Sequence, residues 1–499
     1  MNENAALPLL LVASSLLPGL VIFCLDEGSV RLRSALNLLG AGAKLVLVAV
    51  MIWGVAGGTS YRVAFPLLPG IHFSLRADPL ALLFVTLSAQ LWFLTTVYAI
   101  GYLENSPNRS RFFGFFSLCV TATVGVAMAG NLLTFLIFYE LLTLSTYPLV
   151  VHRGTAAARR AGNRYLVYTI GGGALLLLGA AWLHALTGTL EFTPRGFLAE
   201  TPAEQRAALS AIFVLLIAGV GVKAALVPLH GWLPQAMVAP APVSALLHAV
   251  AVVKAGAFGI VRIVYDVYGV EFAAGLGLTD GLALVAAVTI IYGSLRAIAQ
   301  VDLKRRLAFS TVSQVSYIAL GVAIVGPLAS IGGIVHLVHQ GLMKITLFFC
   351  AGNYAETLGI HRIDELDGVG RRMPWTTVAF TIGAAGMIGL PPVAGFISKW
   401  YLGLGALEAG AGWAVWVLAG SSALNAAYFL PLLYRAWFRP SPEAWPAERH
   451  FGRAETRLAL LLPPLVTAAL ALASGLFASI PYSPQEWAAL VVNREFYAR

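Results

Sequence analysis

The chain has 499 residues, of which 59% are hydrophobic and only 11% are charged, and its mean hydropathy is +0.81. Soluble globular domains carry roughly 25% charged residues, so this composition excludes a soluble enzyme or binding module and indicates a chain whose solvent is the bilayer. The net charge of +9 requires no nucleic-acid partner, because an excess of Lys and Arg in loops on one side of a membrane accounts for it.

Apolar segments recur along the whole chain. A membrane-spanning helix needs roughly 20 apolar residues, and about fourteen such segments are expected. In chain order they cover residues 6–24, 34–55, 79–101, 112–129, 131–151, 164–186, 209–229, 241–267, 278–299, 307–326, 328–352, 375–392 continuing to 408, 413–437 and 457–480. The runs are continuously apolar and not alternating, so they predict an all-α, polytopic helical bundle and exclude a β-barrel. The first run has no basic residue ahead of it and is long for a secretion signal, so we expect it to be the first helix.

The loops divide into a set rich in Arg and Lys and a set with few such residues. The rich set contains Arg31, Arg33, Arg109, Arg111, Arg153, Arg159, Arg160, Arg164, Lys304, Arg305, Arg306, Arg362, Arg371, Arg372, Arg435, Arg439, Arg449, Arg453 and Arg457. The poor set contains Arg62, Arg76, Arg195, Arg206 and Arg262, with two more in the C-terminal tail. By the positive-inside rule the rich loops are cytoplasmic, so after fourteen crossings both termini are expected on the other side.

The cysteines indicate no metal or redox chemistry. Cys24, Cys119 and Cys350 lie in or beside apolar spans without paired spacing, so neither a metal site nor a disulfide framework is expected. The sequence also has no phosphate-binding glycine loop after a strand and no haem motif. We therefore expect no cofactor and no chemistry within this chain.

Ionisable residues inside the apolar spans are the main functional signal, because each costs at least a few kcal/mol at membrane depth. They are Lys44, Glu140, Lys223, His248, Lys254, His336, His339, Lys344 and Lys399, with His184 and His230 nearer segment ends. Desolvation and a nearby carboxylate move the pKa of a buried lysine in opposite directions, and histidine titrates near neutrality. A row of such groups bridged by water can carry protons. Lys44 has no acid near it in the sequence, so it is expected to snorkel or face a partner protein and stays outside this row.

Glu140 is the only carboxylate well inside a predicted span and therefore needs a cationic partner. The candidate is Lys223, which is followed by Pro228, a residue that breaks or bends a helix. Broken helices at membrane depth mark ion sites in transporters. The alternative is a structural ion pair that only fixes helix packing.

Two later spans continue the row. Residues 241–267 carry His248 and Lys254, and residues 328–352 carry His336, His339 and Lys344 in a broad stripe on one helix face. A lone histidine in a span is more often a packing residue. Three titratable groups along one apolar helix favour a functional role.

The segment at 375–408 has the same arrangement as the span at 209–229, in which a proline lies near a lysine. It has a Pro391–Pro392 break among glycines, followed by Lys399. Two Pro/Gly-interrupted spans at corresponding places predict two inverted five-helix repeats. The expected units are N-terminal helices at 1–111, a first repeat at 112–267, a second repeat at 278–437, and a last helix and tail at 438–499.

These residues resemble the antiporter-like subunits of respiratory complex I, membrane-bound hydrogenases and Mrp-type sodium/proton antiporters, over nearly the whole chain. The strings that carry the resemblance are FYELLTLSTYPLV around Glu140, KAALVPLHGWLPQAMVAPAPVSALLHAVAVVKAG from Lys223 onward, DLKRRLAFSTVSQ from Asp302, HQGLMKITLFF around Lys344 and GLPPVAGFISKWYL around Lys399. The resemblance implies a proton relay through Glu140, Lys223, Lys254, His336 with Lys344, and Lys399. A lysine at 399 differs from the glutamate usual in the middle complex I subunit of this type, and the strings QAMVAPAPVSALLHAVAVVKAG, KITLFFCAG and DELDGVGRRMPW are most similar to the D-type member of the Mrp antiporters.

The expected function is therefore proton translocation in a multisubunit Mrp-type Na⁺/H⁺ antiporter of the bacterial inner membrane. Expected partners are other membrane subunits, including homologous ones, together with lipid, H⁺ and Na⁺. One alternative is a proton-pumping arm of an NADH:quinone oxidoreductase or membrane-bound hydrogenase, which copurifying redox proteins would identify. A second alternative is the membrane component of an inorganic-carbon uptake complex, which a copurifying zinc protein would identify.

Overall fold

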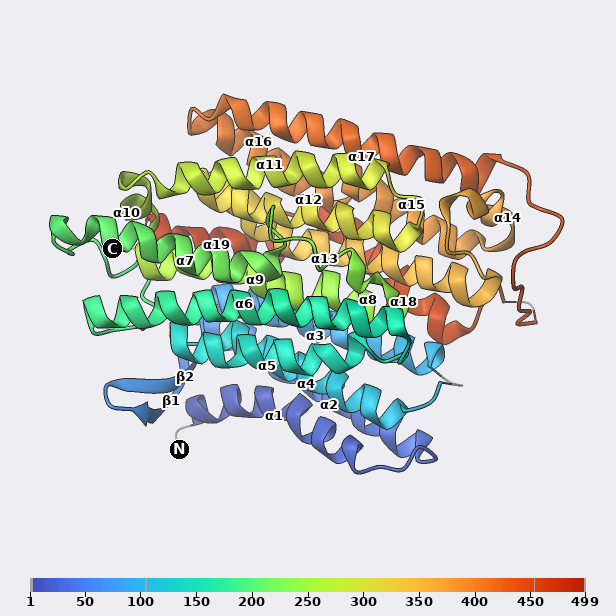
Figure 1. The fold of residues 1–499 in the computed structure, drawn as a ribbon, viewed down its shortest axis with the longest axis horizontal. Coiled ribbons are helices and arrows are strands. Elements are labelled where there is room, and N and C mark those ends of the chain that lie inside the picture. The colour runs from blue at the N-terminus through green and yellow to red at the C-terminus, as the bar shows by residue number, and fades with distance from the viewer. Residues whose placement is uncertain (1–2, 104–105, 453, 498–499) are drawn as a thin grey trace.

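The computed structural model describes residues 3–103, 106–452 and 454–497. Its helices run side by side along one direction, with the N-terminal helices at one edge of the molecule and residues 394–438 at the other (Figure 1). The fold is the predicted all-α bundle, and one two-stranded sheet accompanies it in the described ranges.

The first part of the chain forms six long helices. These are α1 (Glu3–Phe23), α2 (Val30–Ala56), α3 (Pro79–Tyr102), α4 (Arg109–Met128), α5 (Leu132–Val150) and α6 (Ala156–Thr187). Several begin at a residue whose side chain accepts a hydrogen bond from the first turn, as helix N-caps do. Asp78 accepts from the Ala81 amide of α3, and Asn131 accepts from the Thr134 amide of α5, both at 2.8 Å.

The middle of the chain contains the broken and irregular helices. It forms α7 (Arg206–Ala224), α8 (Ala241–Ala245), the π-helical η3 (Leu246–Val250), α9 (Val252–Arg262), the π-helical η4 (Ile263–Tyr268), α10 (Val270–Gly275), α11 (Leu278–Ile298) and α12 (Leu303–Ala323). Short 3-10 turns η1 (Ala203–Gln205) and η2 (Gln235–Val238) flank α7 and its break. The predicted span at 241–267 is therefore one continuous crossing with two π-helical segments.

The last part of the chain begins with a long buried helix, α13 (Pro327–Leu358). The elements that follow it are η5 (Ile363–Leu366), α14 (Val369–Arg372), α15 (Pro374–Ile388), α16 (Ala394–Glu408), α17 (Gly412–Phe438), α18 (Leu458–Leu476) and α19 (Pro484–Phe496). The apolar windows of α13 and of the segment Ala241–Tyr268 are completely buried. These two elements form the centre of the bundle, and the other helices screen them from lipid.

Twelve helices of the described residues are long and apolar enough to cross a membrane. The other two predicted spans are α12 and the α15–α16 pair. The hydropathy of α12 is reduced by Lys304, Arg305 and a run of Ser, Thr and Gln. The α15–α16 crossing is divided at Pro391 and Pro392 into two pieces of 15 residues each.

A short β-hairpin and an amphipathic C-terminal helix were not predicted. The strands β1 (Tyr61–Leu68) and β2 (Ile71–Ala77) pair antiparallel between α2 and α3. Helix α19 follows α18 and packs against α3 and α13. Both N and C labels lie at the same end of the molecule as this hairpin, which we call the hairpin end (Figure 1).

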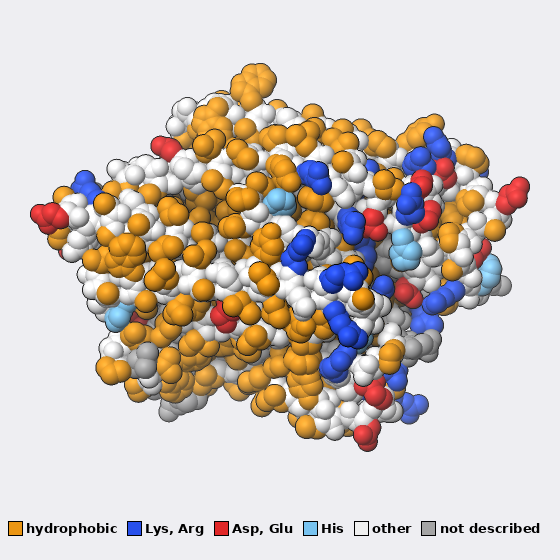
Figure 2. Space-filling model, viewed as in Figure 1, with side chains coloured by type: hydrophobic (Ala, Val, Ile, Leu, Met, Phe, Trp, Pro, Cys, Tyr) orange, Lys and Arg blue, Asp and Glu red, His pale blue; other side chains and the backbone are white. Residues whose placement is uncertain are grey.

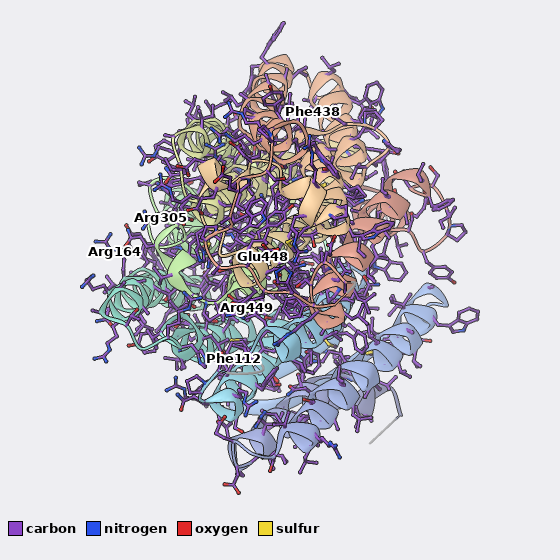
Figure 3. The ribbon with its side chains drawn as sticks, turned by 90° about the vertical axis from the view of Figure 1, so that its right-hand side faces the viewer. Phe112, Arg164, Arg305, Phe438, Glu448 and Arg449 are labelled. Carbon is purple, nitrogen blue, oxygen red and sulfur yellow. The ribbon has the colours of Figure 1, made fainter. Side chains whose placement is uncertain are left out.

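Basic side chains gather toward the opposite end. Figure 2 shows a band of Lys and Arg beyond the wide apolar girdle. Figure 3 looks onto this end and labels Arg164, Arg305 and Arg449 there. This asymmetry agrees with the division of loops that the sequence indicated. We call it the arginine-rich end.

Candidate functional site

Glu140 is half-buried in the middle of α5 and faces α6. A Cβ atom added to Gly173 of α6 would lie 2.0 Å from its Oε1, so the carboxylate occupies the space that a side chain at this position would need. The predicted ion pair with Lys223 is not closed, because no salt bridge among the described side chains joins the two residues. Oε1 of Glu140 has no hydrogen-bond partner among the described protein groups.

Lys223 is fully buried in the last turn of α7 and reaches α5 one residue away from Glu140. Its Nζ donates to the backbone carbonyl of Tyr139 and lies 3.3 Å from the centroid of the Tyr139 ring. The helix ends directly afterwards, and the indole of Trp232 donates to the freed carbonyl of Val222 at 2.8 Å. The predicted break therefore follows Lys223 immediately, and a side chain satisfies its exposed backbone.

His248 and Lys254 lie on the central crossing and face α13. His248 belongs to η3, is fully buried, and stacks on Phe348 with ring centroids 4.5 Å apart. Lys254 of α9 donates from Nζ to the carbonyl of Leu337 at 2.7 Å. Leu337 follows His336 directly, so the lysine contacts the backbone of the stripe on α13.

His336 connects α13 to the second broken crossing. Its Nδ1 lies 2.7 Å from Oγ of Ser398, which directly precedes Lys399 on α16. Its ring stacks on Tyr317 at 5.1 Å, and Lys399 Nζ lies 5.4 Å from the centroid of the same tyrosine ring. His339 is fully buried, and neither of its ring nitrogens has a partner among the described protein groups.

Lys344 and Lys399 are joined by an unbroken series of hydrogen-bonding groups. Lys344 Nζ donates to Ser310 Oγ at 2.7 Å, and the hydroxyls of Ser310 and Tyr428 lie 2.9 Å apart. The single proton of the Tyr428 hydroxyl goes to Oδ1 of Asn425, so Ser310 is the donor to Tyr428, and the amide of Asn425 donates to the carbonyl of Met387 at 3.0 Å.

Lys399 completes this series at the break between α15 and α16. Its Nζ donates to the carbonyls of Met387 at 2.9 Å and Ile388 at 2.8 Å. These carbonyls are exposed to it because α15 ends at Ile388. Gly389, at φ +98°, leaves the space that the lysine stem occupies. The broken helix thus provides acceptors for the lysine.

Lys44 neither snorkels nor faces a partner, contrary to the expectation from sequence. It is fully buried between the first four helices. Its Nζ donates to Ser15 Oγ at 2.8 Å, and Thr121 donates to the same oxygen at 2.9 Å. Its ammonium also lies 5.2 Å from the Trp92 ring centroid. It is separate from the row that begins at Glu140.

Arg262 is not a loop residue, contrary to the expectation from sequence. It is 1% exposed and binds Asp78 through both terminal nitrogens, at 2.8 and 2.9 Å, and Asp266 at 2.7 Å. Burial by itself raises the pKa of Asp78. The charges of Arg262, Arg494 and Arg76 outweigh burial and hold the pKa of this carboxyl well below its usual range.

The neutral members of the site were not predicted from the sequence. Ser310, Tyr317, Ser398, Asn425 and Tyr428 are all fully buried. Ser310, Tyr317 and Ser398 contact Lys344, Lys399 or His336, and Tyr428 and Asn425 extend the series from Ser310. Their only signal in the sequence is a hydroxyl or amide inside an apolar span. Such residues are frequent in membrane helices and usually bond within their own helix.

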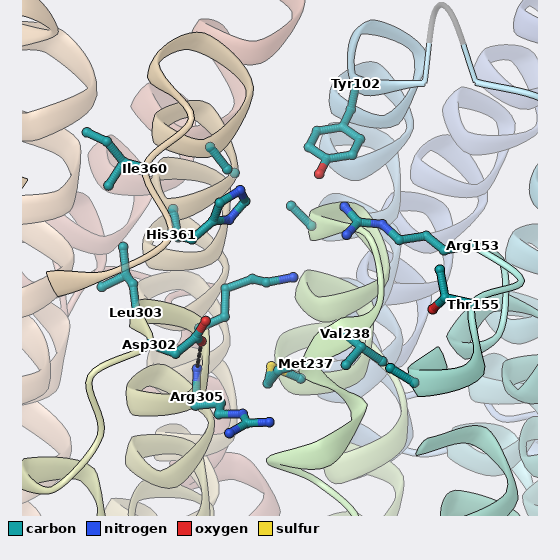
Figure 4. Close-up of a pocket in the computed structure, with 16 residues that line it drawn as sticks. Tyr102, Arg153, Thr155, Met237, Val238, Asp302, Leu303, Arg305, Ile360 and His361 are labelled. Carbon is teal, nitrogen blue, oxygen red and sulfur yellow. Dashed lines mark hydrogen bonds between the residues drawn. The ribbon is translucent and has the colours of Figure 1, made fainter. Parts of the chain in front are cut away.

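A cavity of about 390 Å³ opens at the arginine-rich end and is lined by residues of α8, α12 and α13 (Figure 4). Figure 4 shows Arg153, Asp302, Arg305 and His361 around it. Its walls include Ala241 at the start of α8 and Ala351 of α13. His248 and Lys344 lie seven residues further along these two helices, a distance of about 10 Å.

The three cysteines are unpaired. The described residues contain no group of three or more His, Cys, Asp or Glu side chains placed to hold a metal ion.

Comparison with known protein families gives two matches along the chain. Residues 129–425 match the family described as NADH:quinone oxidoreductase/Mrp antiporter, TM, and residues 69–113 match the N-terminus of chain 5 of NADH-ubiquinone oxidoreductase (complex I). The first match contains every titratable residue of the row from Glu140 to Lys399.

Two curated relatives illustrate the range of complexes in this family. NADH-quinone oxidoreductase subunit N of Desulforudis audaxviator is 36% identical over 492 residues, covering 95% of this chain and 96% of the relative. The D-type component of the Na(+)/H(+) antiporter of Alkalihalophilus pseudofirmus is 29% identical over 333 residues and covers 66% of each chain.

Solved structures share the whole fold. A chain of the Mrp complex from Dietzia sp. DQ12-45-1b superposes with a TM-score of 0.86 at 24% identity, covering 100% of this chain and 98% of the other. A chain of an archaeal membrane-bound sulfane sulfur reductase gives a TM-score of 0.86 at 25% identity, covering 97% of each chain.

Proposed function

Since the chain belongs to the NADH:quinone oxidoreductase/Mrp antiporter family of membrane subunits, we propose that it conducts protons along the row Glu140, Lys223, His248, Lys254, His336, His339, Lys344 and Lys399. The observation that carries this proposal is the series of hydrogen-bonding groups from Lys344 through Ser310, Tyr428 and Asn425 to Lys399. The series holds both lysines among neutral hydrogen-bonding groups and away from lipid, and water is the proposed carrier of the proton where the Asn425 amide and the Met387 carbonyl cannot relay it.

The first half of the row requires water. No hydrogen bond among the described residues joins Lys223 to His248 or Lys254. Buried polar atoms are normally satisfied by protein or ordered water. Both ring nitrogens of His248 and His339 lack protein partners in the described structure, so water molecules fit here as the bridging groups.

The arginine-rich end is the proposed cytoplasmic side of a bacterial inner membrane, and both termini then lie on the other side. The cavity lined by Ala241 and Ala351 supports access from this side, because two helices lead from it to His248 and Lys344. We take it as the aqueous entry to the row.

The complex that contains the chain is proposed to be a redox-driven proton pump. Support comes from the relative in Desulforudis audaxviator, whose similarity extends over almost the entire length of both chains. The chain itself would then respond electrostatically to neighbouring subunits, while electron transfer occurs elsewhere in the complex. Homologous antiporter-like subunits are the expected neighbours.

A cation/proton exchanger of the Mrp type is the second candidate, with this chain as its D-type component and Na⁺ as the exported ion. The 29% identity to the sodium antiporter component of Alkalihalophilus pseudofirmus favours it, as does the lysine at 399.

Gentle purification followed by transport assays tests these proposals. The complex is reconstituted in vesicles, and internal pH is followed after a sodium pulse or after adding an electron donor and acceptor for the copurifying redox proteins. Copurified iron–sulfur or flavin subunits with donor-dependent acidification support the pump. Sodium-dependent exchange without redox subunits supports the antiporter. Vesicles in which neither treatment moves protons would contradict both candidates.

A further inference from the structure

Six charged side chains form a buried cluster at the hairpin end, which we call the hairpin-end cluster. Its buried members are Asp78, Arg262, Asp266 and Glu495, and Arg76 and Arg494, at 19% and 22% exposure, form its edge. They come from three distant parts of the chain: the end of β2, the junction of α9 with η4, and α19. Three guanidinium groups face three carboxylates, so the cluster is neutral when every member is ionised.

Arg262 fixes the end of the helix that carries Lys254. It is the last residue of α9, eight residues after Lys254 and about 12 Å away along the axis. Its bidentate contact with Asp78 restrains both the position and the rotation of that end. The rings of Phe258 and Phe192 lie 5.1 and 5.5 Å from the guanidinium carbon.

Helix α9 lies between two irregular segments. The π-helical η3 precedes it and the π-helical η4 follows it. In a π-helical turn the hydrogen-bond ladder changes register, and such turns recur at functional sites. A rotation of α9 about its axis can therefore be absorbed at its two ends. That rotation sets whether Lys254 reaches the Leu337 carbonyl.

Helix α19 is connected to both helices that form the Lys254–Leu337 contact, α9 and α13. Arg494 binds Asp266 of η4 at 2.8 Å and Asp78 at 3.3 Å, and both carboxylates also bind Arg262, the last residue of α9. The indole of Trp487 donates to the Pro79 carbonyl at 2.7 Å, and α19 packs against α13, the helix that carries Leu337. Glu495 completes the attachment by accepting from the Arg195 amide at 2.8 Å.

We propose that α19 is a clamp that positions Lys254 for proton transfer to the α13 stripe, and that Arg494 is its positioning residue. The proposal rests on the proposed function, since it assigns Lys254 a role in the row. When Arg494 holds Asp266, α9 stays in the rotation that places Lys254 against α13. Release of Arg494 frees that rotation and changes the surroundings in which Lys254 exchanges its proton.

The test measures the pH profile of proton uptake into vesicles that contain the purified complex, driven by an imposed potassium diffusion potential. Wild type is compared with Arg494→Met, Arg494→Lys and Trp487→Phe. Arg494→Met is expected to move the pH midpoint of the rate by roughly one unit, and Arg494→Lys to restore most of it. Trp487→Phe keeps every charge and the apolar ring, and is expected to move the midpoint in the same direction by less.

Arg62→Met is the matched control, because Arg62 forms an exposed pair with Glu191 at the same end, with the two side chains 52% and 37% exposed. Its midpoint should equal that of wild type. The proposal is overturned if both Arg494→Met and Trp487→Phe lower the rate equally at every pH while the midpoint stays fixed, which is the result of a purely structural cluster. Unchanged uptake in Lys254→Met would instead reject the proposed function, independently of the clamp.

Discussion

At the scale of single residues, the second half of the row depends on neutral groups as much as on charged ones. Lys344 and Lys399 are both cations when protonated and cannot form an ion pair. Ser310, Tyr428 and Asn425 separate them. Ser310 is the acceptor for Lys344, whereas Lys399 donates to the carbonyls of Met387 and Ile388. This arrangement lets one lysine lose its proton while the other keeps its charge, which lowers their mutual repulsion.

Tyr428→Phe tests this arrangement. The substitution removes one hydroxyl, which is the only group that links Ser310 to Asn425 among the described residues, and leaves the aromatic packing intact. We expect the rate of proton uptake to fall by at least about tenfold, with the amount of folded complex unchanged. Tyr434→Phe is the control on the same helix, because Tyr434 is 57% exposed. Wild-type uptake in Tyr428→Phe would remove this series from the pathway.

Gly173→Ala tests the position of Glu140. The added methyl group would lie 2.0 Å from Oε1, so the carboxylate must move or α6 must shift from α5. A carboxylate at the end of a flexible side chain can move aside at little cost in stability, so proton uptake should fall while the melting temperature changes little. Gly171→Ala is the matched control two residues earlier, where a Cβ meets nothing within 4 Å. Equal behaviour of the two variants would show that Glu140 is not held as described.

The charged residues of the row were predictable from sequence, because a Lys, His or Glu inside an apolar run stands out by composition alone. Their partners were not. Arg262 looked like a loop residue because it lies near the end of an apolar run, and its acceptor Asp78 is 184 residues away. Lys44 looked unpaired because its acceptor Ser15 is an ordinary residue on another helix.

At the scale of elements, helix breaks and helix ends place the polar groups. The break after α7 positions Lys223, and the break after α15 exposes two carbonyls to Lys399. Pro228 predicted the first break, and Pro391 and Pro392 among glycines predicted the second. The π-helical segments around α9 have no comparable signature, and the hairpin and α19 lie in stretches too short and too polar for a span prediction.

The attachment of α19 should depend on pH through Glu495. Burial first, and then the nearby charge of Asp266, raise the pKa of Glu495 to about 7 in the folded chain, against an ordinary value of 4.5. Its ionisation therefore costs stability, and this cost is absent below pH 4.5 and complete above about pH 7. Glu495→Gln should gain thermal stability relative to wild type as pH rises through this window. A stability difference that is constant from pH 4.5 to 8 would contradict the assignment.

At the scale of the whole molecule, the titratable groups of the row lie inside a sheath of apolar helices, with Glu140 and Lys344 near the middle of α5 and α13. The completely buried crossings Ala241–Tyr268 and Pro327–Leu358 carry most of the row, while helices such as α2 and α17 present exposed tryptophans, Trp53 and Trp416, at 76% and 80% exposure. The sequence predicted this architecture because hydropathy and the positive-inside rule act over the whole chain. It could not decide which neighbours cover the apolar surface, because lipid and partner helices select the same residues.

Conduction along the row is tested by proton uptake into vesicles containing the purified complex, compared between wild type, Glu140→Gln and Lys399→Met under an imposed diffusion potential. Each change removes one end of the row while preserving side-chain volume. Glu271→Gln, at an exposed carboxylate of α10, is the control. We predict that both end variants lose uptake by at least about tenfold, although they assemble normally, and that Glu271→Gln keeps the wild-type rate. Full uptake in either end variant would mean that protons do not travel along this row.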